Sequence, residues 1–208
     1  MSKFPKLFIP GPTHVSDDIL KVLSTPQIGH RTPEISELID YLVKGIQKVL
    51  YTKNLIYLVS HAATGLWEMG TKNSVNKGVL HCINGAFSSK WFFSSQQNGF
   101  TADAIDYEWG CGTKAEDIDK MLSTGKYDVL AMVHNETSTG VAFRWLSELG
   151  KLAKDKGAFY IIDAVSSLGG DELNVDDLGV DICVTGSQKC LAAPPGLSLM
   201  SLSEQVKD

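Results

Sequence analysis

Short apolar runs alternate with amphipathic stretches along most of this chain, and this alternation limits its fold more than any other feature. Several runs are apolar nearly throughout, which is typical of strands that helices cover on both faces. We expect strands at Leu55–Val59, Gly78–Ile83, Ala104–Tyr107, Asp128–His134, Ala158–Asp163, Asp181–Thr185 and Leu197–Leu202. The pattern predicts an α/β fold with a mostly parallel seven-stranded sheet and helices on both faces.

Three of the intervening stretches carry apolar residues at helical spacing. They are Pro33–Tyr51, Lys114–Leu122 with Thr113 as its N-cap, and Trp145–Lys156, which Gly157 ends. Residues 1–32 are rich in proline and predict an irregular arm. We therefore divide the chain into an arm, residues 1–32, and one domain, residues 33–208.

Composition narrows the class of protein. The chain has 208 residues, enough for one domain with a substantial core, and its formal net charge is −5. No run of lysine and arginine exceeds two residues, so nucleic acid is excluded as the main partner. The four cysteines lack metal-site spacing, which favours a reduced, cytosolic setting. No stretch has the length of a membrane span or of a signal core, so we expect no membrane partner.

Ligands of open α/β sheets bind at the carboxyl ends of the strands, so the residues that follow each apolar run are the candidates for a site. Taken singly, each has a structural explanation: Asp163 as a turn former, Phe87 as a core residue, His61 and His134 as structural histidines. The small residues before Leu66 also suit a helix start that binds phosphate. The five candidate segments are Ser60–Gly65, Asn84–Phe87, His134–Thr137, Asp163–Ser167 and Gly186–Lys189.

Lys189 differs from the other lysines. It follows an apolar run and a Gly-Ser-Gln turn, and it is the only charged residue between Asp181 and Glu204. Apolar surroundings favour the neutral amine that forms a Schiff base with a carbonyl group. The sequence thus predicts a reactive lysine at this position.

The segment Gly186-Ser187-Gln188-Lys189, followed by Ala193-Pro194-Pro195-Gly196, resembles the cofactor-lysine segment of class V aminotransferases. The alanine–glyoxylate and serine–glyoxylate (serine–pyruvate) enzymes are the most similar group. The resemblance covers about residues 7–203 and implies the large domain of the fold type I transferases that use pyridoxal 5′-phosphate. Other segments match in the same order: Pro10–Thr13, Gly29–Arg31, Thr64–Glu68, His134–Val141 and Asp163–Ser167.

The resemblance implies roles for individual residues. Lys189 would form the Schiff base with the cofactor and move a proton at the substrate. Asp163 would keep the pyridine nitrogen protonated. The remaining cofactor-binding residues would be Phe87 and Val165 on the two ring faces, Thr137 near the phenolic oxygen, and Ala63, Thr64 and Gln188 at the phosphate.

The resemblance also implies a reaction: transfer of an amino group from alanine or serine to a 2-oxo acid such as glyoxylate or pyruvate, in a homodimer. Two positions depart from the family pattern, with Ala62 where relatives have glycine or serine and Phe87 where many have tryptophan. Relatives also continue into a small C-terminal domain with an arginine for the substrate carboxylate. We therefore expect a truncated chain with little activity alone.

Three alternatives remain open. A cysteine-desulfurase-like lyase usually has histidine where this chain has Gln188. A non-catalytic remnant or scaffolding module would fit the short length and the Ala62-Ala63 loop. A nucleotide-binding oxidoreductase would require a Gly-x-Gly-x-x-Gly motif after a strand, which is missing. The sequence identifies neither the amino donor nor the acceptor, nor a role for Arg31 or His61.

Overall fold

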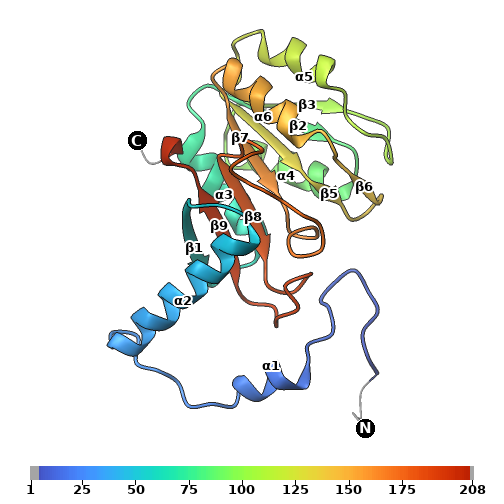
Figure 1. Ribbon diagram of the computed structural model, residues 1–208. Helices are drawn as coiled ribbons and strands as arrows, with labels where there is room; N and C mark the ends of the chain where they lie inside the picture. Colours follow the sequence, from blue (N-terminus) through green and yellow to red (C-terminus); the bar gives the residue numbers. More distant parts are fainter. Residues whose placement is uncertain (1–4, 207–208) are drawn as a thin grey trace.

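The computed structural model describes residues 5–206, so the first four residues of the predicted arm and the last two of the predicted domain lie outside the described residues. The predicted seven-stranded sheet is confirmed, with the order β1-β9-β8-β7-β4-β2-β3 (Figure 1). Its strands are β1 Leu55–Val59, β2 Val79–Ile83, β3 Ala102–Asp106, β4 Val129–Val133, β7 Phe159–Asp163, β8 Ile182–Gly186 and β9 Ser198–Leu202. A separate two-stranded sheet pairs β5 (Asn135–Glu136) with β6 (Val141–Ala142).

The direction of the strands determines where a site can form. Strands β2, β3, β4, β7 and β8 are parallel, and β9 is antiparallel to both of its neighbours. Strand β1 pairs with β9 from Leu55 opposite Leu202 to Val59 opposite Ser198, so it runs in the direction of β8. The carboxyl ends of β1, β2, β4, β7 and β8 therefore share one edge of the sheet, where ligands of such folds bind.

Helices cover both faces, as predicted. Along β4, Val129, Ala131 and Val133 belong to one core cluster, whereas Leu130 and Met132 belong to the other. Helices α3 (Ala63–Ser74) and α4 (Ala86–Gln97) pack on the first cluster. Helices α5 (Ala115–Leu122) and α6 (Leu146–Asp155) pack on the second, because side chains alternate between the two faces of a strand. Cys82 and Cys183 are buried residues of the core.

Local predictions were less accurate. The predicted N-cap Thr113 is wrong: Lys114 occupies that position, and the buried Thr113 hydroxyl has no hydrogen-bond partner among the described residues. Helix α4 was not predicted, and β3 begins two residues before the predicted start. The arm contains one short helix, α1 (Asp17–Val22), and a 3₁₀ turn, η1 (Glu204–Val206), follows β9.

Helix α2 (Pro33–Val49) forms as predicted, yet none of its residues is buried. Its apolar side chains Leu38, Ile39 and Leu42 are exposed, and in Figure 1 α1 and the start of α2 extend away from the sheet. Nearer its end, Val43 and Ile46 of α2 pack against the core. Among residues 5–206, no helix combines the length and the hydrophobicity needed to span a bilayer.

The packing of α6 against the segment around Leu178 can be tested at Gly150. A Cβ atom at this position would lie 2.0 Å from the carbonyl oxygen of Leu178, which is backbone and cannot turn aside. We expect Gly150→Ala to lower the free energy of unfolding by about 1–3 kcal/mol, measured by urea denaturation. The control is Gly45→Ala on α2, where nothing lies within 4 Å and a small gain of about 0.5–1 kcal/mol is expected. Equal stability of the two variants would contradict this account of α6 packing.

Candidate active site

One pocket at the carboxyl edge of the sheet collects every residue for which the sequence predicted a cofactor role. It encloses about 170 Å³. Segments after β1, β2, β4, β7 and β8 all contribute to its wall, because those strands end at the same edge. The predicted residues that line it are Ala63, Thr64, Phe87, Thr137, Asp163, Val165, Gln188 and Lys189.

Asp163, the last residue of β7, is a buried carboxylate in this pocket. Its Oδ2 accepts a hydrogen bond from the Trp67 indole Nε1 at 2.7 Å, and its Oδ1 accepts one from the Val165 backbone N–H at 2.7 Å. Burial raises the pKa of Asp163 to about 6, although the two hydrogen bonds oppose the shift. The carboxylate is thus ionised at neutral pH but gains a proton readily.

Lys189 lies half-buried beyond β8, and the arm reaches it. Its Nζ donates a hydrogen bond to the Pro10 carbonyl at 3.2 Å. Thr13 donates through its backbone N–H to Gln188 O at 2.9 Å and through its hydroxyl to Lys189 O at 2.9 Å. Gly11 lies so close that a Cβ there would be 2.6 Å from Nζ. The arm therefore packs against the lysine segment, which spacing along the chain did not reveal.

The N-terminus of α3 forms another side of the pocket. Ala62 is its N-cap residue and makes no side-chain cap hydrogen bond, and Ala62, Ala63 and Thr64 all line the pocket. The first backbone N–H groups of a helix carry partial positive charge and lack partners within the helix. This wall is thus suited to an anion such as a phosphate group.

Phe87 is the second residue of α4, and 39% of it is exposed, so the reading as a core residue is wrong. Val165 contributes a half-buried apolar side chain to the same pocket. The two residues supply apolar surface in the pocket that Asp163 and Lys189 also line. This combination of a few polar groups with apolar walls is typical of sites for small organic ligands.

Sequence reasoning missed Trp67, but it correctly read His134 as a structural histidine. Trp67 reads as an ordinary apolar residue of a helix, but it lines the pocket, donates to Asp163 and stacks on Trp91 with ring centroids 5.5 Å apart. His134 is structural: it is buried, and its Nδ1 pairs with the Ser167 hydroxyl at 2.8 Å. His61 and Arg31 are exposed, and neither lines the pocket.

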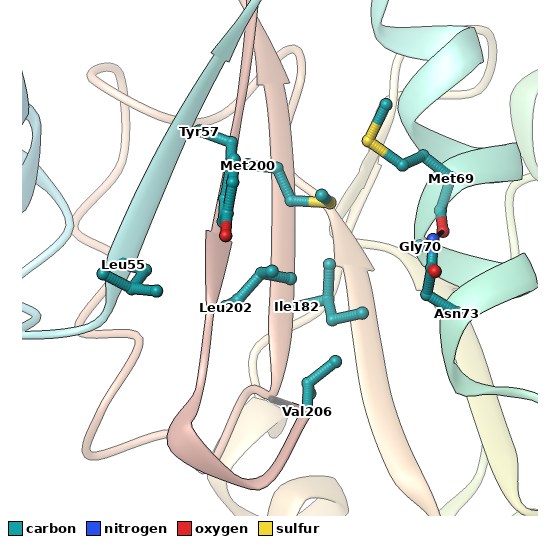
Figure 2. A pocket seen from close by; sticks show the side chains of 9 residues that line it. All are labelled: Leu55, Tyr57, Met69, Gly70, Asn73, Ile182, Met200, Leu202 and Val206. Atoms are coloured by element: carbon teal, nitrogen blue, oxygen red, sulfur yellow. Dashed lines mark hydrogen bonds between the residues drawn. The ribbon is translucent and has the colours of Figure 1, made fainter. Parts of the chain in front are cut away.

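A larger groove of about 440 Å³ lies toward the other end of the strands. Figure 2 shows its wall: Tyr57 on β1, Met200 and Leu202 on β9 and Ile182 on β8, with Met69 of α3 across from them. None of the residues that line it is an acid, a lysine, an arginine or a histidine. Its size therefore does not make it a candidate for acid–base chemistry, and the smaller pocket remains the site.

Comparison with known proteins agrees with this geometry. The profile of the family described as "Aminotransferase class-V" matches residues 79–208. The chain is 42% identical to an uncharacterized aminotransferase of Methanocaldococcus jannaschii over 96% of this chain and 52% of that protein. It is 34% identical to the L-aspartate–glyoxylate aminotransferase of Paracoccus denitrificans, over 97% of this chain and 53% of that protein.

Among solved structures, the ureidoglycine–glyoxylate aminotransferase of Bacillus subtilis superposes with a TM-score of 0.92 at 28% identity. The match covers the whole of this chain and 55% of that one. The chain thus spans about half the length of the relatives it matches. The resemblance first noted in the Gly-Ser-Gln-Lys segment is confirmed, and this chain belongs to the class V aminotransferase family.

Proposed function

We propose that the pocket binds pyridoxal 5′-phosphate, with Lys189 as the residue that bonds covalently to the cofactor and Asp163 as the partner of its ring nitrogen. The observation that carries the proposal is the convergence of a lysine amine and a buried carboxylate, 26 positions apart in sequence, in one small pocket. Membership of the class V aminotransferase family supports the same cofactor.

The residues present fit this group in three respects. Asp163 is a buried carboxylate, which an aromatic N⁺–H would pair with. The uncapped start of α3 suits the phosphate, with the N–H groups of Ala63 and Thr64 and the Gln188 side chain as its donors. Phe87 and Val165 would pack on the two ring faces, and Thr137 would bond the phenolic oxygen. Ala62 contributes no hydroxyl to the phosphate, so its backbone neighbours would carry more of the binding.

When bound, pyridoxal phosphate supplies a ring that accepts the negative charge developing at an amino acid Cα when its proton leaves. The protein's share is acid–base chemistry and orientation. Lys189 Nζ would remove the proton from the substrate Cα and deliver it to C4′ of the cofactor. The ionised Asp163 would hold the proton on the ring nitrogen, and its two existing hydrogen bonds fix the carboxylate in place.

For the whole protein we propose transamination from a small amino acid, alanine or serine, to a 2-oxo acid such as glyoxylate or pyruvate. Both named relatives with an assigned reaction, from Paracoccus denitrificans and Bacillus subtilis, are glyoxylate aminotransferases, which supports the acceptor class. The desulfurase-like and non-catalytic alternatives have no comparable support from these two relatives.

We also propose that the full-length form is a homodimer. Exposed apolar side chains recur along α1 and α2, which pack little against the rest of the chain. A stripe of this kind is typical of a surface that meets another protein. A second copy of the chain would cover it symmetrically.

The test uses purified chain and pyridoxal phosphate. We expect a yellow complex, and borohydride reduction followed by peptide mass mapping should place one phosphopyridoxyl group on Lys189. Exposed lysines such as Lys154 in the same digest serve as internal controls for non-specific labelling. Labelling spread evenly over exposed lysines, with Lys189 unmodified, would sink the proposal.

A further inference from the structure

A second buried carboxylate, Glu136 of β5, lies close to the pocket but does not line it. Its exposed fraction is 0%, so water does not solvate its charge. Glu136 belongs to the candidate segment His134–Thr137, but none of the roles proposed above involves it. A buried carboxylate is costly unless donors surround it, so its surroundings indicate what it does.

Five donors converge on the Glu136 carboxylate. Oε2 accepts hydrogen bonds from the Ser88 backbone N–H and the Ser88 hydroxyl, both at 2.9 Å. Oε1 accepts from the Ser138 hydroxyl at 2.6 Å, from the Ser138 N–H at 3.2 Å and from the Phe87 N–H at 3.3 Å. Burial by itself would raise the pKa of Glu136, but the hydrogen bonds from Ser138, Ser88 and Phe87 outweigh it and lower the pKa. Glu136 is therefore an anion at neutral pH.

Two of these donors are the first-turn amides of α4, at the positive end of that helix. Phe87 carries one of them, and its ring forms part of the pocket wall. Ser138 adds a second tie, because its hydroxyl also accepts the Ala86 N–H at 2.9 Å. The start of α4, and with it the backbone of Phe87, is thus bound to β5 and the turn after it.

We propose that Glu136 is a positioning residue: its carboxylate fixes the N-terminus of α4 and hence the Phe87 ring, and it places a second negative charge within reach of Asp163. The inference rests on the proposed function for the meaning of Phe87 and Asp163 in catalysis. We call the hydrogen bonds that join Glu136 to Phe87, Ser88 and Ser138 the clamp, and these bonds do not depend on a cofactor.

The electrostatic half of this role has a defined sign. Glu136 lies three residues beyond Val133, which pairs with Asp163 across β4 and β7, so the two carboxylates belong to the same end of the sheet. The Glu136 charge raises the pKa of Asp163, and the Lys189 charge lowers it. Burial, together with Asp163, raises the pKa of the Cys183 thiol on β8. Removal of the Glu136 charge should therefore make Asp163 more acidic. A ring nitrogen paired with Asp163 would then compete with a weaker base for its proton.

Glu136→Gln is the sharpest variant, because it keeps shape but replaces one acceptor oxygen with an NH₂ donor. The new NH₂ group then faces either the Ser88 donors or the donors of Ser138 and Phe87, and the donors that face it lose their acceptor. We expect amide hydrogen exchange at Phe87 and Ser88 to accelerate roughly 10-fold or more in cofactor-free protein. The control is Glu148→Gln, the same change at an exposed position of α6, which should leave this exchange unaltered.

A second readout follows the charge. The Trp67 indole N–H, assigned in an NMR spectrum by its loss in Trp67→Phe, should titrate with Asp163 near pH 6 in wild type. In Glu136→Gln the midpoint of this titration should move to lower pH, whereas in Glu148→Gln it should not move. A third readout is the dissociation constant of pyridoxal phosphate, which should rise about 10-fold while labelling remains on Lys189.

The outcomes separate the two proposals. If wild type takes up no pyridoxal phosphate, the proposed function fails, but exchange and titration still decide whether Glu136 positions α4 and acts on Asp163. Unchanged exchange together with an unchanged midpoint overturns the role of Glu136. Should Glu136→Gln fail to fold, Ser138→Ala removes the 2.6 Å bond and the tie to Ala86, and faster exchange at Ala86 and Phe87 is expected. Wild-type exchange rates in that variant would overturn the clamp.

Discussion

Replacing Lys189 with alanine should abolish covalent retention of pyridoxal phosphate. No other amine is placed to replace it if the proposed function holds, because among residues 5–206 Lys189 is the only lysine that lines the pocket. Borohydride-stable label should fall to the background level of exposed lysines. The rate of amino-group transfer from an added amino acid to the bound cofactor, followed by the absorbance change, should fall roughly 10²–10⁴-fold.

The matched control for this variant is Lys154→Ala, which removes an exposed lysine on α6. It should retain labelling and rate. Loss of the Lys189 side chain also removes the contact with Pro10 O, so circular dichroism of both variants should be compared to exclude a general loss of structure. If Lys189→Ala kept a specific, stoichiometric label, the catalytic lysine would lie elsewhere.

Replacing Asp163 with asparagine should weaken cofactor binding and also change how stability depends on pH. The ring nitrogen would lose its anionic partner, so the dissociation constant of pyridoxal phosphate should rise by one to two orders of magnitude, roughly the energy of a charge-assisted hydrogen bond. Asp155→Asn, at an exposed carboxylate that ends α6, is the control and should bind as wild type does.

The stability effect has a defined direction. The folded-state pKa of Asp163, about 6, lies above the value of 3.8 for an unperturbed aspartate. The protonated form is therefore favoured in the fold, and its contribution is present at low pH and lost as pH rises through 6. In cofactor-free protein, the unfolding free energy of Asp163→Asn relative to wild type should grow by about 2 kcal/mol between pH 4 and pH 7. A pH-independent difference would show that burial does not perturb this carboxylate.

The centre of the sheet was predictable because strands β2, β4 and β8 are buried along their whole length. Runs such as Val129–Val133 must satisfy two apolar faces, so nearly every residue is apolar, and the signal is strong even without alternation. Helix α4 escaped prediction for the opposite reason. Only Ser88, Trp91 and Ser95 are buried on it, and two of those three are polar, so no apolar stripe marks the helix.

The site was predictable as a set of segments but not as a set of contacts. The strand-end rule and the family resemblance together selected eight of the thirteen residues that line the pocket. The bond from Trp67 to Asp163 joins residues 96 positions apart, and the contact of Pro10 with Lys189 spans 179 positions. Such partners depend on the packing of whole elements, for which local sequence carries no signal.

The place of β1 at the border of the sheet has a consequence for how the molecule assembles during synthesis. Within residues 5–206, β1 pairs with β9 alone, and β9 is made about 140 residues later. The loop that leads from β1 into α3 therefore has no paired strand beneath it until residues 198–202 have been synthesised. Nascent chains that stop before residue 198 should leave that first strand unpaired and open to association with other chains.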